Sequence, residues 1–265
     1  MDINSNFSLG LQTSYPDSYN PSVLCPIERP PRLLGMKGTD LWTAYEISWA
    51  LPSGKPQVAI AELSVPCLSP FLIESKSLKL YLNSLNSYQV ADWAELETLV
   101  IADLTAVAGA DVEFKLFPLD SAQFLVTSLE GFCLDELPIA TSTYTPTPDF
   151  LSASVKEVEE TLTTHLFRST CPVTNQPDWA SIQIDYTGGQ INQEGLLKYL
   201  ISYRHHQGFH EHCVEMMFSD ILEYCQPTSL SVYARFTRRG GLDINPFRST
   251  HFDFPPLYPC RLPRQ

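Results

Sequence analysis

A cysteine and an aspartate seven positions apart are the residues of this chain best suited to covalent chemistry. Cys171 and Asp178 bound the segment Cys171-Pro-Val-Thr-Asn-Gln-Pro-Asp178, in which two prolines and an asparagine favour turns. A thiolate adds to an electrophilic carbon, and a nearby carboxyl group can give a proton to the atom that becomes negative. A structural interpretation also stays open, because free cysteines are often small buried hydrophobic residues and an Asp after Pro is often a turn residue.

Two predicted strands hold this segment. Residues 158–167 are rich in β-branched and apolar types, and residues 180–186 alternate so that their isoleucines and Tyr186 share one face. We therefore expect Cys171 to lie on a loop that a rigid scaffold fixes on both sides.

A predicted helix begins near Ile73-Glu74-Ser75-Lys76. Apolar residues after this point recur with the spacing of one helical face: Leu78, Tyr81, Leu82 and Leu85. Free backbone N–H groups at a helix start attract anions, and a lysine adds to the attraction. An ordinary capped helix start explains the same residues without a ligand.

Another helix, predicted over residues 210–225, opens with Gly208-Phe-His210-Glu211-His212-Cys213. A histidine here can orient a substrate or pass a proton near neutral pH, and a glutamate can accept two hydrogen bonds from a planar donor pair, such as the edge of a guanine-like base. Acidic helix capping beside surface histidines is a second interpretation. A metal site is a third, with His210, His212, Cys213 and Cys171 as ligands, although their spacing matches no standard zinc pattern.

The densest basic stretch of the second half comprises Arg235, Arg238, Arg239, Gly240 and Gly241. Arginines bind phosphate with two parallel hydrogen bonds, and glycines let the backbone approach a ligand closely, so this stretch favours a phosphorylated cofactor. A hairpin turn with solvated arginines is the alternative. The glycine pattern of dinucleotide-binding α/β domains is missing, so a nicotinamide cofactor is not expected to bind in that manner.

Composition excludes several classes of protein. The net charge of −13 over 265 residues argues against binding nucleic acid through its phosphates and against an anionic membrane surface. No apolar run is long enough for a transmembrane helix, and the N-terminus lacks the layout of a signal peptide. Seven cysteines without a CxxC pattern favour reduced thiols, so we expect a cytoplasmic protein.

The predicted elements divide the chain into four segments: an N-terminal arm (1–40), a first module (41–127), a Thr/Pro-rich linker (128–152) and a second module (153–265). Each module is expected to have the order β-β-α-α-β-β, with the last strand of the first module near residues 123–127. Tyr81-Leu-Asn-Ser84 aligns with Tyr199-Leu-Ile-Ser202 at an offset of 118 residues. We therefore predict an α+β protein built from two copies of one unit.

Four motifs together resemble the NADPH-dependent nitrile reductases of queuosine biosynthesis, the 7-cyano-7-deazaguanine reductases of the tunnelling-fold superfamily. They are Glu74-Ser-Lys-Ser-Leu-Lys-Leu-Tyr81, Cys171-Pro-Val-Thr-Asn-Gln-Pro-Asp178, Phe209-His-Glu-His-Cys213 and Arg238-Arg-Gly-Gly-Leu-Asp-Ile-Asn-Pro246. The resemblance covers nearly the whole chain beyond the arm. It implies the long form of the family, with tandem tunnelling-fold modules that each have an antiparallel sheet and two helices on one face.

The resemblance also implies roles. Cys171 is the nucleophile that forms a covalent thioimidate with the nitrile, Asp178 is the proton donor, and His210 assists protonation and orientation. The deazaguanine is bound by Glu211, with Ile73, Glu74, Ser75 and His210 lining its site. NADPH is bound by Ser75, Lys76, Arg239 and Gly240.

The implied reaction consumes two NADPH, requires no metal and gives an aminomethyl product, and the implied assembly is a homodimer. Two other functions stay open from the residues. One is a zinc-dependent tunnelling-fold enzyme that acts on a pterin or purine, like a GTP cyclohydrolase. The other is a purine-binding module without catalytic activity.

Overall fold

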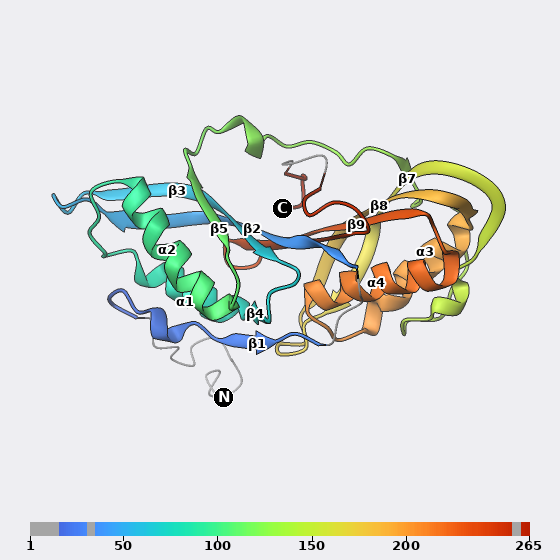
Figure 1. The fold of residues 1–265 in the computed structure, drawn as a ribbon, viewed down its shortest axis with the longest axis horizontal. Coiled ribbons are helices and arrows are strands. Elements are labelled where there is room, and N and C mark those ends of the chain that lie inside the picture. Colours follow the sequence, from blue (N-terminus) through green and yellow to red (C-terminus); the bar gives the residue numbers. More distant parts are fainter. Residues whose placement is uncertain (1–15, 31–34, 256–260) are drawn as a thin grey trace, which may run out of the picture.

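One large sheet with helices on one of its faces forms the body of the molecule (Figure 1). The computed structural model describes residues 16–30, 35–255 and 261–265. The sheet has eight strands in the order β5 (Glu113–Phe117), β3 (Pro56–Pro66), β2 (Lys37–Ala50), β10 (Leu242–Ser249), β9 (Ser229–Phe236), β8 (Pro177–Ile191), β7 (Ala153–Thr170) and β6 (Phe132–Cys133). Neighbouring strands are antiparallel except for β6 and β7. A small second sheet pairs β1 (Pro26–Glu28) with β4 (Phe71–Ile73).

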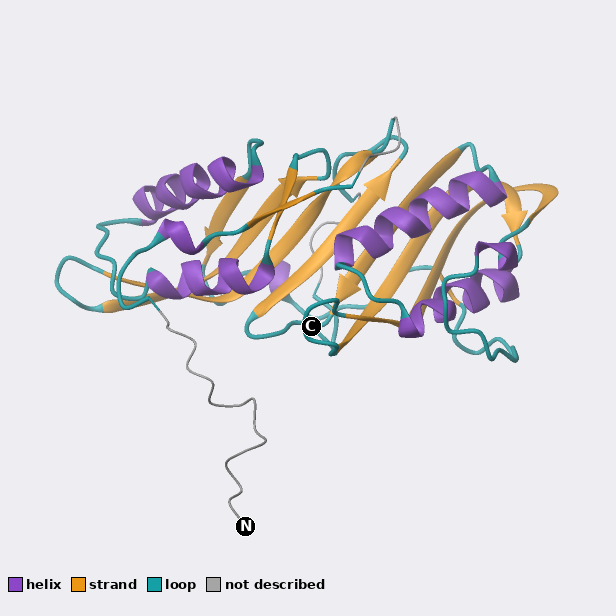
Figure 2. Ribbon diagram, turned by 90° about the horizontal axis from the view of Figure 1, so that it is seen from below, coloured by secondary structure: helices purple, strands orange, loops and turns teal. Residues whose placement is uncertain are grey.

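The four α-helices in the described part of the chain cover one face of the large sheet (Figure 2). They are α1 (Ser75–Ser84), α2 (Trp93–Ala108), α3 (Gln193–Ser202) and α4 (His210–Cys225). Apolar side chains of α1 and α2 pack on β2, β3 and β5 in one core cluster, and those of α3 and α4 pack on β7, β8 and β9 in another. Burial of these apolar faces drives the packing of helices on the sheet. The predicted α+β class is confirmed.

The two halves of the chain share internal hydrogen bonds as well as element order. The hydroxyl of Tyr81 donates to Asp103 at 2.6 Å, and the hydroxyl of Tyr199 donates to Asp220 at the same distance. A serine three residues later, Ser84 or Ser202, donates to the carbonyl of its own tyrosine at 2.6 Å in both halves. The repeat seen as a short sequence match is therefore also a repeated contact between paired helices.

Strand β10 joins the two halves into one sheet. It follows β9 in the chain, but it pairs along its whole length with β2, from Leu242 opposite Ala44 to Ser249 opposite Lys37. Because β2 belongs to the first half, the end of the second half lies at the centre of the sheet. The turn between β9 and β10 is thereby held at the junction of the two halves.

The strand predicted over residues 123–127 is wrong. Residues Ala122–Phe124 form a short 3₁₀ helix, and Val126 makes only an isolated bridge with Arg261. The alternating pattern was short, and the turn after Pro118 directs the chain away from the sheet. Leu125 and Val126 are consequently exposed.

The segments predicted as an arm and a linker both pack on the body. Residues 1–15 and 31–34 lie outside the described residues, but β1 pairs with β4 and the side chain of Arg29 is buried against Asp40. The predicted arm therefore contributes a buried side chain at Arg29, and its predicted boundary at residue 40 is wrong because residues 37–40 are the first of β2. In segment 128–152, β6 pairs with β7, and Leu134 and Leu151 enter the core of the second half.

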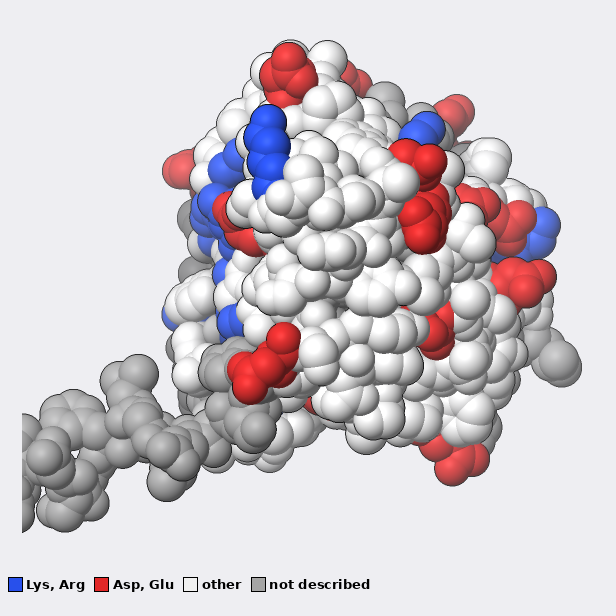
Figure 3. Space-filling view, turned by 90° about the vertical axis from the view of Figure 1, so that its left-hand side faces the viewer, with Lys and Arg blue, Asp and Glu red and all other residues white. Residues whose placement is uncertain are grey.

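Surface charge follows the acidic composition. Seen from the end formed by the first half, acidic and basic side chains are dispersed among uncharged ones, and most of the basic ones in view lie toward the left-hand margin (Figure 3). In the described part of the chain, no helix has both the length and the apolar character that crossing a membrane requires.

Candidate active site

The turn between β7 and β8 brings Cys171 and Asp178 to the same end of a hairpin. The strands pair as far as Thr170 opposite Pro177, so Cys171 is the first residue of the loop and Asp178 lies just inside β8. The loop is closed by two backbone hydrogen bonds, from Cys171 N–H to the Gln176 carbonyl at 2.9 Å and from Asn175 N–H to the Cys171 carbonyl at 3.0 Å. Hairpin pairing thus brings together two residues that are seven positions apart.

Asp178 is buried between the side chains of Arg239 and His210. Arg239 Nη1 donates to Oδ1 at 2.6 Å, and His210 Nε2 lies 3.4 Å from Oδ2. Burial alone raises the pKa of this carboxyl, but the hydrogen bonds and positive charges of His210 and Arg239 outweigh burial and hold it below its usual range. In this arrangement Asp178 is a carboxylate, ready to accept a proton before it gives one.

His210 is the first residue of α4, and packing fixes its ring. The imidazole stacks on Phe236 with ring centroids 3.8 Å apart and an angle of 1° between the planes. Its Nδ1 atom is buried and has no hydrogen-bond partner among the described residues. The ring therefore directs Nε2 toward Asp178 from a position that strand β9 determines.

Glu211 is buried one residue further along α4. Burial raises the pKa of its carboxyl to about 7; the carboxylate of Asp40 adds to this rise, and the charges of His210 and Arg29 oppose it. A carboxylate with such a pKa changes charge easily when a ligand brings hydrogen-bond donors to it. Glu211 can therefore serve as a buried acceptor for a planar, polar ligand edge.

A buried network of charges supports Glu211. Asp40 forms ion pairs with Arg29 and, at 2.7 Å, with Arg248, while Glu215 pairs with Arg248 at 2.7 Å. Glu215 lies one helical turn after Glu211, so both face the same side of α4. Because these residues come from the arm, β2, β10 and α4, the charges beside Glu211 are set by contacts among distant parts of the chain.

Helix α1 presents the other wall of the site. Glu74 is its N-cap, and its carboxylate accepts the backbone N–H groups of Lys76 at 2.9 Å and Ser77 at 2.7 Å. The prediction of free donors at this helix start is therefore wrong for these two N–H groups. The positive charge there comes from the side chains of Lys76 and Lys79.

The turn after β9 completes the site with Arg239 and Gly240. Gly240 has a φ of 61°, and a side chain at this position would collide with the ammonium group of Lys79. Glycine fits this left-handed conformation and the close approach of α1 at the same time. The guanidinium of Arg239 and the ammonium groups of α1 consequently border one cavity.

All ten predicted site residues line a single cleft of about 450 Å³: Ile73, Glu74, Ser75, Lys76, Cys171, Asp178, His210, Glu211, Arg239 and Gly240. Residues from both halves contribute, which agrees with the site lying where β10 joins them. The residues predicted for the site therefore lie together in one cleft.

Part of the predicted basic stretch lies elsewhere. Arg235 is buried and donates to Gln265 and to Tyr233, and Arg238 lies over the ring of Tyr45 at 4.6 Å. Neither these arginines nor Gly241 lines the cleft. Arg235 lies in β9, which ends at Phe236, whereas Arg238 and Arg239 lie in the turn before β10, so a run of arginines that is dense in sequence is divided in space.

Several lining residues were missed from the sequence. Trp42, Leu242 and Ile244 form an apolar wall, Ile27 comes from the arm, and Lys79 lies beside Gly240. Of these residues, only Lys79 could have been predicted from the local sequence, because it follows Lys76 by three residues and so lies on the same face of α1. The others come from strands whose neighbours could not be known from the sequence.

The metal site considered above does not form. Cys213 is fully buried, where its thiol is held protonated because burial raises its pKa to about 12, and His212 lies beside His206. Among the described residues, the donor atoms of His210, His212, Cys213 and Cys171 do not gather within the distance that a metal ion spans.

Comparison with known proteins gives consistent matches along the chain. Residues 15–116 match a family model described as the N-terminal part of nitrile reductase, 7-cyano-7-deazaguanine reductase, and residues 177–253 match a model described as QueF-like protein. A protein of Desulfotalea psychrophila named NADPH-dependent 7-cyano-7-deazaguanine reductase is 48% identical, over 94% of this chain and 95% of that protein. Proteins of the same name from Legionella pneumophila and Delftia acidovorans are 48% and 49% identical, over 94% and 92% of this chain and 91% and 93% of their own lengths.

Among solved structures, the archaeosine synthase QueF-Like in the apo form matches 35% of this chain and 91% of its own chain. The match has 18% sequence identity and a TM-score of 0.31.

Proposed function

The chain belongs to the family of NADPH-dependent 7-cyano-7-deazaguanine reductases, and on that premise we propose that it reduces the nitrile of 7-cyano-7-deazaguanine to an aminomethyl group with two NADPH, as a step of queuosine biosynthesis. The observation that carries the proposal is the single cleft lined by Cys171, Asp178 and Glu211 together with the cationic residues of α1. Its walls come from both halves of the chain, so the site exists only in the assembled fold.

The base is bound at Glu211. A deazaguanine presents a ring N–H and an amino group side by side, which is the donor pair that one carboxylate accepts. Two charge-assisted hydrogen bonds favour the ionised form of a group whose pKa is about 7, so binding removes the proton. Ile73, Glu74 and Ser75 border the same space from the start of α1.

Cys171 forms the covalent bond. A nitrile accepts hydride poorly, and addition of the thiolate converts it into a thioimidate, a C=N group that is a better acceptor. Because Asp178 begins as a carboxylate, we propose that it first takes the thiol proton from Cys171 and then delivers it to the nitrile nitrogen as the C–S bond forms. His210, which contacts Asp178 and stacks on Phe236, orients this transfer.

The residues present fit NADPH as the reductant. Lys76, Lys79 and Arg239 place positive charge at the rim of the cleft, and Gly240 leaves the backbone accessible to a phosphate group. NADPH supplies both hydrides. After the first hydride is added, the C–S bond breaks and its electron pair leaves with Cys171 as thiolate. The imine that remains in the cleft takes the second hydride, and a proton from solvent completes the amine.

We infer further that each half is a tunnelling-fold unit and that the protein is a homodimer. In the described chain, edge strand β5 pairs with β3 alone, which leaves one edge of the sheet open to a second copy. The acidic net charge disfavours nucleic acid as a direct partner. The free cysteines among the described residues suit a reducing compartment such as the cytoplasm.

The test combines turnover with detection of the adduct. Incubation with 7-cyano-7-deazaguanine and NADPH is expected to consume two NADPH per nitrile, and incubation with the nitrile alone is expected to add its mass to the protein. Cys171→Ala should abolish both, while Cys25→Ala, which changes an exposed cysteine outside the cleft, should abolish neither. Tight binding of the base without turnover or adduct in folded protein would instead indicate a non-catalytic binding module.

A further inference from the structure

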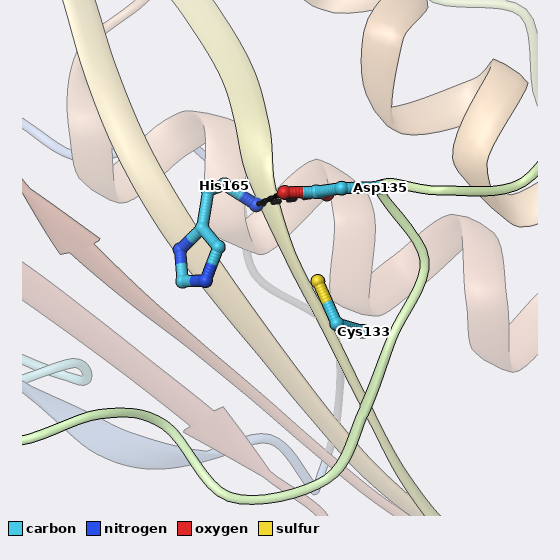
Figure 4. Close-up of side chains that lie close together, drawn as sticks. All are labelled: Cys133, Asp135 and His165. Atoms are coloured by element: carbon cyan, nitrogen blue, oxygen red, sulfur yellow. Dashed lines mark hydrogen bonds between the residues drawn. The ribbon is translucent and has the colours of Figure 1, made fainter.

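A second group of chemically active side chains lies away from the cleft. Cys133, Asp135 and His165 each offer one donor atom, and the thiol, carboxylate and imidazole atoms all lie within 4.8 Å of one another. None of the three lines the cleft of about 450 Å³. Figure 4 shows them grouped beside β7, with the carboxylate of Asp135 bonded to the backbone of His165.

An irregularity in β7 brings His165 to Asp135. Strand register shifts between Thr164 and Phe167, and such a bulge leaves backbone groups without ladder partners. Asp135 satisfies one of these backbone groups, because both of its oxygens accept the His165 N–H at 3.1 Å. Asp135 Oδ1 also accepts a hydrogen bond from the side-chain hydroxyl of Thr164 at 2.6 Å. The parallel pairing of Cys133 with Thr163 places the thiol beside the same bulge.

Two of the three donors are held by outer partners. His165 Nδ1 lies 2.8 Å from the hydroxyl of Ser181, which leaves Nε2 as the free ring nitrogen. Ser181 is itself fixed by Arg264 Nη2 at 3.0 Å. Metal-binding histidines commonly have one ring nitrogen held in this way, and their carboxylate neighbours are hydrogen-bonded as Asp135 is.

We propose that Cys133, Asp135 and His165 form a binding site for one divalent cation of the zinc class, with water as the fourth ligand. A thiolate and an imidazole beside a carboxylate suit zinc, whereas magnesium and calcium take oxygen ligands. Metal–ligand bonds of about 2.0–2.3 Å in a tetrahedron set donor atoms roughly 3.5 Å apart. Cys133 and His165 are exposed, so small side-chain rotations close the remaining distance.

The ion would crosslink the segment between the two halves to the second half. Cys133 and Asp135 belong to segment 128–152, whereas His165 belongs to β7. Strand β6 has only two residues, so backbone pairing alone holds this segment weakly to the sheet edge. A cation that binds only the folded chain raises the stability of the folded protein.

The test is a zinc titration of protein first treated with chelator, made in the Cys171→Ala background so that the cleft thiol does not compete. One zinc per chain is expected, together with a higher unfolding temperature. Cobalt added in place of zinc should give the near-ultraviolet absorption of a thiolate ligand. Cys133→Ser and His165→Gln should weaken zinc binding by at least about tenfold, and Ser181→Ala by about 10–100-fold, as loss of an outer partner does.

Matched controls separate this site from adventitious binding. Cys25→Ser and His205→Gln change another exposed cysteine and another exposed histidine, and both should bind zinc as tightly as the parent protein. NADPH oxidation by Cys133→Ser and His165→Gln, made with Cys171 intact, should stay near the wild-type rate and show that they fold. Absence of stoichiometric zinc in the parent, or zinc retained by both Cys133→Ser and His165→Gln, would overturn the proposal.

Discussion

Replacing Glu211 with glutamine should stabilise the ligand-free protein at alkaline pH and weaken substrate binding. Burial, aided by the charge of Asp40, raises the pKa of Glu211 from 4.5 to about 7. In the unfolded chain the carboxyl ionises near its usual pKa, so the folded protein bears the full cost of a buried charge only above pH 7. Each pKa unit corresponds to about 1.4 kcal/mol, so this cost is on the order of 3 kcal/mol.

The stability advantage of Glu211→Gln over the wild-type protein should therefore increase as pH rises. Below about pH 4.5 the carboxyl is protonated in both states, and Glu211→Gln should unfold with nearly the wild-type free energy. As pH rises from about 4.5 to about 7, the carboxyl ionises in the unfolded chain but stays protonated in the folded one, so wild-type protein loses stability that the neutral amide keeps, and the difference levels off above pH 7. Denaturant unfolding at pH values from about 4.5 to 8.5, without substrate, measures the difference. Glu194→Gln, at the exposed first turn of α3, is the matched control and should show no such trend.

Glu211→Gln should weaken substrate binding although it stabilises the ligand-free protein. The amide that replaces the Glu211 carboxylate would face the donor edge of the base with one acceptor only, so loss of charge-assisted hydrogen bonds should weaken binding by roughly 10–100-fold. Wild-type affinity should rise between pH 6 and 8 as the carboxylate becomes populated, and the variant should lose this rise. A stability difference that is equal at both ends of the pH range, or a variant that becomes less stable than wild type in alkali, would refute the reasoning.

Three further changes test the neighbours of the site. Arg239→Met removes the cation 2.6 Å from Asp178, so the pKa of Asp178 should rise and the acidic limb of the pH–rate profile should move to higher pH. The control is Arg238→Met: the side chain of Arg238 lies over an aromatic ring, so its loss should leave the acidic limb in place. Gly240→Ala should displace the Lys79 ammonium and raise KM for NADPH while the covalent adduct still forms in the absence of NADPH; failure to form the adduct would contradict this assignment. Arg29→Met leaves Asp40 with one fewer cationic partner in a buried network and should lower the unfolding free energy by about 3–5 kcal/mol, measured by denaturant titration, whereas a change within about 0.5 kcal/mol would show that the pair adds nothing.

Local sequence determined most of the elements and the chemistry of the site. The spacing of Leu78, Tyr81, Leu82 and Leu85 predicted α1, because a helix buries one face and repeats every 3.6 residues. Prolines and an asparagine marked the loop after β7 that carries Cys171, with Asp178 seven positions further on. These features depend on residues close in the chain, and their physical causes are visible in a short stretch of sequence.

Tertiary structure alone decided which residues share a cavity and how they are charged. The pairing of β10 with β2 has no local signal, since any strand with a similar pattern could occupy that position, yet it brings α1 to the hairpin that carries Cys171. The pKa of Glu211 depends on burial and on Asp40 and Arg29, which lie in the opposite half of the chain. The arginine stretch is divided, with Arg239 in the cleft and Arg235 buried elsewhere, because Arg235 lies in β9 and Arg239 lies in the turn after it, and only the fold decides what packs against each.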